Sequence, residues 1–383
     1  MAAQSNGNLS LNKVIVITTQ CFFPNVGGIE DLMTGMTKAL KRNGKEIMVF
    51  ADGEDHDDDK HQNYELLRFN HWKPIRRKLK ARRINSLIKN KKIELIIADS
   101  WKSVEYLNKL DVKIFILAHG SEIQKLPFSI FNFHKSQKNI RISKSYDKAN
   151  KIIANSTYTK NLLTKTFNIE SDRIHIIHPG VEFNENNFDV NVESNVKKII
   201  KNNNPVLVTL ARLEKRKGHK FIIEALARLK IKYPNILYLI AGNGNYKKNI
   251  YEHAKLFDVQ NNIKFIGWVH EPEKSILLQN SDLFVMTPGT ESESVESFGM
   301  VFIDANLNGL AVIGADNGGM ADAIIDGKTG LIAKTANVDD ITYKIDSLLS
   351  DKKKRDSLGK YGREYAMTKY PWDHKIKEYL DLI

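Results

Sequence analysis

The sequence predicts an α/β protein with two domains, each built on an open parallel sheet. Short apolar segments of strand length alternate with longer segments whose apolar residues recur at helical spacing. This alternation restarts after a polar stretch at 182–204, which is rich in Asn, Glu and Lys and is expected to hold the linker. The 383 residues also exceed what one hydrophobic core usually supports, since most domains have about 100–150 residues.

The first half begins with a buried strand predicted at 14–18. Gly27 and Gly28 then lead into a helix predicted at 29–42, in which Leu32, Met36 and Leu40 recur at helical spacing. Further strands are predicted at 46–50, 95–98, 114–118 and 151–154, and a helix at 82–89. Sheets of this kind bind ligands at the carboxyl ends of their strands, so the loops there are the first places to look for a site.

The second half repeats the pattern, with strands predicted at 206–210, 237–241, 262–266, 283–286 and 310–313 and a helix at 221–230. The last segment, 341–383, is helical in pattern and is broken at Pro371. We therefore expect a first domain at 1–190, a second at 191–365, and a C-terminal helix at 366–383 that returns toward the first domain.

The charge of the chain indicates an anionic partner. Its 58 basic and 45 acidic residues give a formal net charge of +13. Phosphorylated ligands, a membrane surface and nucleic acid all fit this charge, but the aromatic and basic interleaving typical of single-strand binding is missing, so nucleic acid is not expected. Cys21 is the single cysteine, which suits a reducing cytoplasm. No apolar run reaches the length of a membrane span, and residues 1–12 do not predict a secretory signal.

The most informative segment contains two acids eight positions apart, Glu296 and Asp304, with Phe298 and Gly299 between them. If 297–307 is helical, eight residues rise roughly 12 Å, and the two carboxylates could serve opposite ends of one elongated ligand. The free N–H groups at the start of such a helix suit a diphosphate, and the helix dipole adds to the attraction.

The segment resembles the signature of the retaining nucleotide-sugar glycosyltransferases of glycosyltransferase family 4, in which two acids flank seven residues. The resemblance extends from about 14 to 372 and implies the GT-B fold, with two Rossmann-like domains facing a central cleft. It implies that Glu296 binds hydroxyls of the donor sugar, and that Asp304, where the family usually has Glu, binds the ribose. The backbone at Phe298, Gly299, Met300 and Val301 is expected at the diphosphate.

Arg212 and Lys217 follow the strand predicted at 206–210 and resemble the family's Arg-x-x-x-x-Lys-Gly element. Breaking a sugar–phosphate bond builds negative charge on the departing diphosphate, and two fixed cations would stabilise it. We expect Glu214 to orient Lys217. Gly242, Trp268 and Val269 end two further strands and are expected at the nucleotide, with the main chain of Trp268 and Val269 at the base.

In the first half, Gly27 and Gly28 resemble the family's glycine loop and are expected near the donor phosphates. The resemblance also implies that His119, at the end of the strand 114–118, hydrogen-bonds the transferred sugar. Two interpretations stay open for Asp322, which follows the pair Gly318 and Gly319: an acid of the donor site, or part of a plain surface turn.

Two charged segments have a functional and a structural interpretation. Acids crowd the stretch 52–59, but such a loop is usually solvated, and the resemblance implies catalysis without a bound metal or other cofactor. The segment 71–89 is the most basic part of the chain. We interpret it as a contact with an anionic membrane or acceptor; an ordinary packed helix with a charged outer face is the alternative. The residues assigned to this contact are Trp72, Arg76, Arg77, Lys78, Arg82 and Arg83.

These observations predict a retaining hexosyltransferase, with a UDP-sugar as first donor and GDP-mannose as second. The acceptor is expected to be a membrane lipid such as diacylglycerol, or a lipid-linked glycan. The enzyme would then be cytoplasmic and peripheral on the inner face of a bacterial cell membrane. The alternatives are a GDP-mannose-dependent transferase of cell-surface polysaccharide synthesis, a non-catalytic protein that binds an anionic surface (membrane or nucleic acid), and a phosphorylase or sugar-nucleotide epimerase of the same fold.

Overall fold

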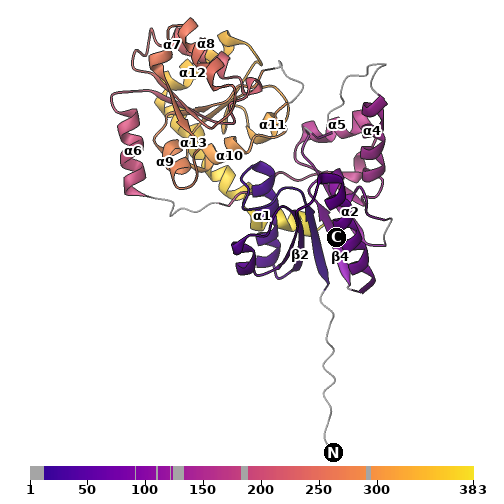
Figure 1. Cartoon of the computed structure of the whole chain (residues 1–383). Coiled ribbons are helices and arrows are strands. Elements are labelled where there is room, and N and C mark those ends of the chain that lie inside the picture. Colours follow the sequence, from indigo (N-terminus) through magenta and orange to yellow (C-terminus); the bar gives the residue numbers. More distant parts are fainter. Residues whose placement is uncertain are drawn as a thin grey trace, which may run out of the picture. The chain divides into compact units, whose positions relative to one another are not determined.

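The computed structural model describes residues 13–90, 92–108, 111–120, 122–123, 133–182, 189–289 and 295–383. The chain forms two compact units (Figure 1). The first unit contains Met1–Asn155, Lys160–Val181 and Trp372–Ile383, and the second contains Ser156–Thr159 and Glu182–Pro371. The chain therefore enters the second unit and comes back to the first at Trp372.

The first unit is built on a parallel sheet of seven strands in the order β3-β2-β1-β4-β5-β6-β7. Its strands are β1 (Val14–Thr19), β2 (Glu46–Asp52), β3 (Glu65–Phe69), β4 (Ile93–Ala98), β5 (Lys113–Ala118), β6 (Lys151–Ala154) and β7 (Ile174–Ile176). The strand order reverses at β1 and β4, which pair with each other. Sheets of this kind bind ligands at such a reversal. The predicted strands are present, and the edge strands β3 and β7 were not predicted; β3 is only half-buried and β7 has three residues.

Helices cover both faces of this sheet: α1 (Gly28–Arg42), α2 (Lys73–Asn90), α3 (Trp101–Val104), α4 (Phe133–Tyr146), α5 (Thr157–Phe167) and α14 (Trp372–Leu380). Alternate residues of each strand point to opposite faces. Val14 and Val16 thus belong to the core that contains residues of α2 to α5. Ile15 and Ile17 belong to the core that contains residues of α1 and α14.

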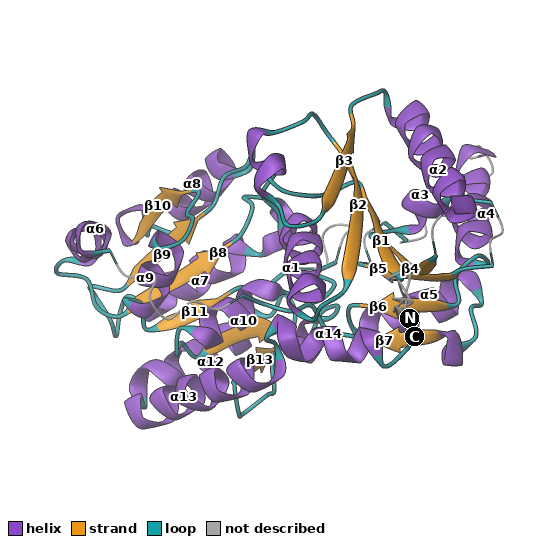
Figure 2. Cartoon of the chain, turned by 90° about the horizontal axis from the view of Figure 1, so that it is seen from below, coloured by secondary structure: helices purple, strands orange, loops and turns teal. Residues whose placement is uncertain are grey.

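Helix α14 completes the second of these cores. It packs along α1, and the two helices lie side by side in Figures 1 and 2. Trp372 is buried in a slot that two glycines leave open. A Cβ added to Gly35 would lie 2.1 Å from the indole Nε1, and one added to Gly180 would lie 2.4 Å from its Cδ2. The last helix of the chain is therefore part of the first unit.

The second unit is built on a parallel sheet of six strands in the order β10-β9-β8-β11-β12-β13. Its strands are β8 (Val206–Leu210), β9 (Leu237–Ala241), β10 (Ile263–Gly267), β11 (Leu283–Val285), β12 (Val312–Ala315) and β13 (Gly330–Ala333). Its order reverses at β8 and β11, which pair with each other. The loops after these two strands therefore lie at the position where a ligand is expected.

The helices of this unit are α6 (Val190–Ile200), α7 (His219–Leu229), α8 (Lys247–Leu256), α9 (Glu273–Gln279), α10 (Met300–Leu307), α11 (Met320–Ala323), α12 (Val338–Ser350) and α13 (Lys352–Lys369). Helix α7 packs against α8 and α12, and α10 packs against α13. Both sheets thus have buried strands and helical cover, which is why their sequences read as continuous apolar runs.

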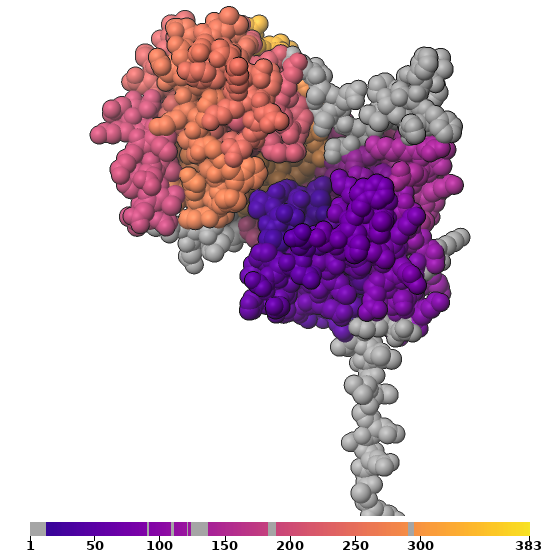
Figure 3. Space-filling model, in the orientation of Figure 1, coloured from indigo at the N-terminus to yellow at the C-terminus, as the bar shows by residue number. Residues whose placement is uncertain are grey.

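Several predicted elements were wrong in extent. The stretch 182–204, expected as linker, contains α6, whose first turn is capped by the Asp189 carboxylate and which lies at the surface of the second unit, in pink in Figure 3. Helix α2 starts nine residues earlier than predicted, because Pro74 suits the first turn of a helix. The C-terminal segment is broken at Asp351 as well as at Pro371, since Asp351 caps α13.

Within the described ranges, none of the helices combines the length and the apolar character that crossing a bilayer requires.

Gly35→Ala provides a test of the Trp372 slot. Helix propensity alone would make Ala in a helix more favourable than Gly by about 1 kcal/mol. We expect the opposite sign, a loss of about 1–3 kcal/mol in the free energy of unfolding, because the added methyl group overlaps a buried indole. Urea unfolding of the full chain measures it. In a Trp372→Phe background the cost should shrink, and a full cost there would contradict the slot.

Candidate active site

The loops after β8 and β11 bring three charged side chains together in the second unit. Lys217 lies in the loop after β8, and its Nζ is 2.5 Å from Oε2 of Glu296, which lies in the segment after β11. Arg216 contacts the same carboxylate oxygen, with its Nη1 at 3.2 Å. The sequence predicts Lys217 and Glu296 in one site, and the structure places them in direct contact within one unit.

The loop after β8 is shaped by glycines that let backbone segments approach closely. Gly218 has a φ of 76°, and a Cβ there would lie 1.8 Å from the carbonyl oxygen of Thr287 in the segment after β11. Gly242 has a φ of 140°, and a Cβ there would lie 1.9 Å from the carbonyl oxygen of Ala211. No other residue type suits these positions, because positive φ and the close approach both exclude a side chain. Gly242, expected at the nucleotide, thus also supports the backbone beside Arg212.

Burial and the two cations act in opposite directions on Glu296. Burial tends to raise the pKa of its carboxyl group, but Lys217 and then Arg216 outweigh burial and hold this pKa below its ordinary value. Burial lowers the pKa of Lys217, and the carboxylate of Glu296 partly offsets that effect. We conclude that Glu296 is ionised at neutral pH and can accept hydrogen bonds from hydroxyl groups.

Arg212 differs from Lys217 in its exposure. Its side chain is 66% exposed, and Nη1 lies 3.3 Å from Oε1 of Glu214. The other oxygen of Glu214 pairs with Arg216 at 2.7 Å. Glu214 was expected to orient Lys217. Its side chain instead contacts the two arginines, while its backbone carbonyl accepts the N–H of Lys217. Arg212 is thus a largely exposed cation that Glu214 holds beside the site.

Helix α10 begins at Met300, three residues later than the 297–307 helix expected from sequence. Gly299 has a left-handed φ of 94° and is the N-cap, so Glu296 lies before the helix and the rise of roughly 12 Å does not apply. Phe298 is buried and packs on Tyr370. Met300 and Val301 form the half-buried first turn, whose N–H groups are available to an anion.

Asp304, on α10, is held by a lysine that the sequence analysis did not single out. Nζ of Lys274 lies 3.5 Å from Oδ1 of Asp304 and 3.0 Å from Oε1 of Glu271. Burial raises the pKa of Asp304, and Lys274 opposes this rise. Burial tends to lower the pKa of Lys274, but Asp304 and Glu271 outweigh it and raise this pKa. Lys274 follows β10 by a few residues, so a search of strand ends for cations would have found it.

The predicted nucleotide residues Trp268 and Val269 lie directly after β10. Trp268 is 40% exposed and meets His270 edge-on, and Val269 is half-buried.

Asp322, for which two interpretations stayed open, accepts a hydrogen bond of 2.7 Å from the backbone N–H of Thr157. Gly319 donates its N–H to the carbonyl of Glu296, so the glycine pair holds the backbone of that acid.

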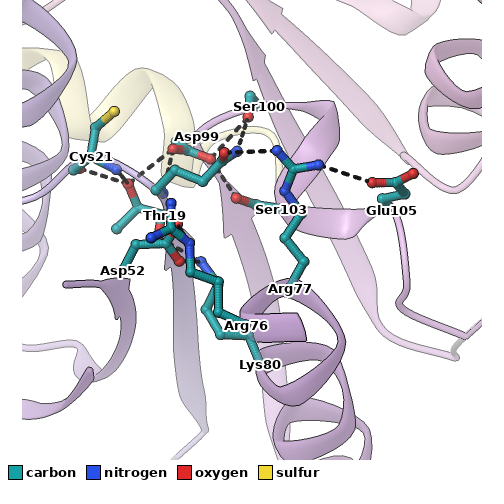
Figure 4. A network of polar contacts seen from close by, with 11 residues as sticks. Thr19, Cys21, Asp52, Arg76, Arg77, Lys80, Asp99, Ser100, Ser103 and Glu105 are labelled. Carbon is teal, nitrogen blue, oxygen red and sulfur yellow. Dashed lines mark hydrogen bonds and ion pairs between the residues drawn. The ribbon is translucent and has the colours of Figure 1, made fainter. Parts of the chain in front are cut away.

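In the first unit, a network of polar contacts lies at the carboxyl ends of β1, β2 and β4 (Figure 4). Asp99, directly after β4, accepts hydrogen bonds from the backbone of Gln20 at 2.6 Å and from the hydroxyl of Ser103 at 2.6 Å. Its carbonyl accepts the Nε2 proton of His119 at 2.9 Å. A carbonyl can only accept, so this contact leaves Nδ1 of His119 for a further partner. Asp99 was missed, although its place at a strand end was a usable signal.

The glycine loop expected near the donor phosphates lies between β1 and α1. Gly27 is the N-cap of α1 and Gly28 its first residue, and no side chain caps this helix start. Gly28 is exposed, and a Cβ there would meet no other atom within 4 Å.

Cys21 lies between β1 and this loop. Burial, with the charges of Asp99 and Glu30, raises the pKa of its thiol to about 12. A raised pKa favours the protonated thiol at neutral pH, which is the less nucleophilic form.

The basic helix α2 uses part of its charge inside the protein. Arg76 pairs with Asp52 at 2.6 Å, and Arg77 pairs with Glu105 at 3.3 Å, as Figure 4 shows. Lys80 is buried and lies 2.5 Å from Asp52. Arg76 and Arg77, expected to face a membrane, are thus held in ion pairs at the sheet edge. The remaining four residues of that set, Trp72, Lys78, Arg82 and Arg83, are exposed.

The same ion pairs explain the acidic stretch 52–59. Asp52 is neutralised by the two cations of α2. Asp59 pairs with Arg68 at 2.6 Å, and the guanidinium holds the pKa of this carboxyl below its usual range. The acids at both ends of the stretch therefore have protein cations as partners.

Two family models match the chain in succession. The model described as Glycosyltransferase Family 4 matches residues 26–185, and the one described as Glycosyl transferases group 1 matches residues 191–365. The chain belongs to glycosyltransferase family 4. The match agrees with the resemblance seen in the sequence, and the second model spans both Lys217 and Glu296.

Among similar proteins is the GDP-mannose-dependent alpha-(1-6)-phosphatidylinositol monomannoside mannosyltransferase of Mycolicibacterium smegmatis, 28% identical over 57% of either chain. The corresponding enzyme for the monoacylated acceptor in Corynebacterium glutamicum is 29% identical over 44% of either chain. The matched region thus spans about half the length of these relatives. The crystal structure of Anabaena HepE in complex with UDP has a TM-score of 0.74, with 18% identity over 96% of this chain and 100% of that one. Its similarity shows the GT-B fold.

Arg212→Ala and Glu296→Ala should separate catalysis from stability. Loss of Arg212 should lower turnover about 100- to 1,000-fold while the free energy of unfolding changes by less than about 0.5 kcal/mol, because the side chain is largely exposed. Loss of Glu296 should also destabilise the protein, by about 3–5 kcal/mol, because it leaves Lys217 buried without its counter-ion. Steady-state kinetics and urea unfolding measure both. Full activity of Arg212→Ala would refute its assignment.

Proposed function

We propose that the protein transfers a hexose from a nucleoside diphosphate sugar to an acceptor hydroxyl, with retention of the anomeric configuration. The observation that carries the proposal is the contact of Lys217 and Arg216 with Glu296 at the strand reversal of the second unit. An ionised acid able to bind sugar hydroxyls thus lies beside Lys217, a cation able to bind a diphosphate. The family match supports the reaction class.

The proposed reaction breaks the bond between the anomeric carbon and the diphosphate oxygen. Arg212 and Lys217 stabilise the negative charge that builds on the departing diphosphate. Glu296 binds hydroxyls of the sugar, and Asp304 binds those of the ribose. The acceptor oxygen attacks from the face that the diphosphate leaves, and its proton passes to a departing phosphate oxygen, so the configuration is kept. His119 is proposed to hydrogen-bond the transferred sugar.

For the donor we now place GDP-mannose ahead of a UDP-sugar. This reverses the order that the sequence suggested, because two of the similar proteins are named as GDP-mannose-dependent. Base recognition is proposed for the main chain of Trp268 and Val269. Lys274 binds both Asp304, the proposed ribose ligand, and Glu271. We propose that no metal ion or other cofactor takes part.

The proposed acceptor is a hydroxyl of a membrane glycolipid or of a lipid-linked glycan. The names of the same relatives, which act on phosphatidylinositol mannosides, support a lipid acceptor. The exposed part of α2 is proposed to contact the anionic inner face of the cell membrane. A peripheral cytoplasmic enzyme without nucleic acid partners fits this proposal.

The deciding experiment incubates the protein with GDP-mannose, UDP-glucose, UDP-galactose and ADP-glucose. Vesicles that contain phosphatidylinositol and diacylglycerol are present or absent, and released nucleotide and lipid-extractable sugar are followed by mass spectrometry. We expect lipid-extractable mannose only with GDP-mannose and vesicles, and an α-linked product by NMR. Absence of donor binding and of turnover with every donor would refute the transferase, and an inverted product would refute retention.

A combined Trp72→Ala, Arg82→Gln and Arg83→Gln variant tests the membrane surface. Each basic residue near an anionic bilayer contributes about 1 kcal/mol, so binding to anionic vesicles should fall about 10- to 100-fold. Cleavage of the donor in solution should not change, since these side chains are exposed on α2. Lys353→Gln with Lys354→Gln on α13 removes two exposed charges as a control. Equal losses in both variants would indicate a general charge effect and not a defined surface.

A further inference from the structure

The three proposed catalytic residues of the second unit are joined by a chain of alternating charges. Arg212 pairs with one oxygen of Glu214 at 3.3 Å, and the other oxygen of Glu214 pairs with Nε of Arg216 at 2.7 Å. Nη1 of Arg216 then reaches Glu296 at 3.2 Å, where Lys217 is also bound. Only Arg212, Lys217 and Glu296 belong to the family pattern; Glu214 and Arg216 are the links that join them.

Lys217 has two roles that compete for the same Nζ. In the structure, Nζ is 2.5 Å from Glu296, whereas stabilising a departing diphosphate requires it to turn toward that anion. When it turns, the carboxylate of Glu296 loses its nearest cation in a site where both side chains are largely buried. An unpaired buried charge costs several kcal/mol, so a second cation must remain at Glu296 for the site to stay intact.

Arg216 has the geometry that this task requires. Its side chain is only 15% exposed, and it uses different nitrogens of the guanidinium for the two acids, Nε for Glu214 and Nη1 for Glu296. A planar guanidinium holds two partners in fixed directions, which a lysine ammonium on a flexible stem does not do. Glu214 in turn holds Arg216 at Nε, while Nη1 remains on Glu296.

We propose that Arg216 and Glu214 are positioning residues of the transferase. Arg216 remains bound to Glu296 when Lys217 turns to the diphosphate. Glu214 binds both Arg216 and Arg212 and so fixes their positions relative to each other. This inference rests on the proposed function and extends it to two residues outside the family pattern. Neither residue needs to touch the donor. Their effect passes through Glu296 and Arg212, which do.

The test compares Arg216→Gln, Glu214→Gln and the double variant with the wild type. Misplacing Glu296 should lower kcat with the preferred donor about 10- to 100-fold in Arg216→Gln. The two residues act through one chain, so the double variant should be little worse than Arg216→Gln alone. Lys215→Gln is the matched control, because Lys215 is an exposed cation of the same turn; its kcat should equal that of the wild type. Fully additive losses would refute the chain.

The pH profile of kcat/KM reports on the free enzyme and is a readout that a merely structural role would not move. Among the described residues, the charged groups in contact with the Glu296 carboxylate are Lys217 and Arg216, and Glu214 faces it across Arg216. Removing Arg216 removes a cation that favours the ionised acid. The acid limb should therefore move to higher pH, by about one unit, in Arg216→Gln and not in Lys215→Gln. Arg216→Lys should reverse part of the shift in the acid limb but restore less of kcat, since lysine restores the charge without a planar guanidinium that holds both acids.

Binding by calorimetry separates this inference from the proposed function. The ratio of the Kd for GDP to the Kd for GDP-mannose, and the same ratio for UDP and UDP-glucose, measures how strongly the sugar is held. A wild type that binds none of these ligands refutes the proposed function itself. If the wild type favours the sugar nucleotide, Arg216→Gln should lose that preference. An unchanged preference and pH profile would refute the positioning role, and a loss confined to the Kd of the nucleoside diphosphate would make Arg216 a phosphate ligand instead.

Discussion

The second unit depends on keeping one carboxylate ionised in a largely buried place. Glu296 lies in the segment after β11, and its partner Lys217 lies in the loop after β8, so their contact joins the two strands at which the sheet order reverses. Neither side chain is tolerable there alone, because an unpaired buried charge is costly. Gly218 lets the loop after β8 approach the backbone of Thr287 after β11, and Gly319 donates its N–H to the Glu296 carbonyl, so these two glycines help to hold the pair together.

The first unit meets a similar requirement with different residues. At the carboxyl edge of its sheet, Asp52 is neutralised by two cations of α2, and Asp99 is satisfied by hydrogen bonds from Gln20 and Ser103. The carboxylates of Asp52 and Asp99 therefore already bind groups of the protein. The contact of His119 with the Asp99 carbonyl uses Nε2, so Nδ1 can bind another partner. Strand ends thus gather polar groups in both units, and the local partners decide which of those groups can act on a ligand.

Much of the fold could be predicted because parallel strands buried on both faces have continuous apolar sequences, as in 237–241 and 151–154. The edge strand β3 was not predicted because a half-buried strand lacks a continuous apolar sequence. Helix α6 was not predicted because the sequence of a polar surface helix resembles that of a linker. The site residues Lys217 and Glu296 carried a spacing that sequence could detect. Lys274 and Asp99 carried a weaker signal, since each only follows a strand end. Their partners, and the pairing of Arg76 with Asp52, could not be predicted, because these depend on which elements the tertiary structure places side by side.

The place of Trp372 has a consequence for how the protein is made. One face of the first sheet is covered by α1 and by a helix that is synthesised only after the entire second unit. During translation, the first unit therefore exposes part of its apolar core until residues 372–383 leave the ribosome. Partly folded chains with exposed apolar surface are prone to aggregate, so the first unit depends on protection from aggregation until the second unit and residues 372–383 have been made.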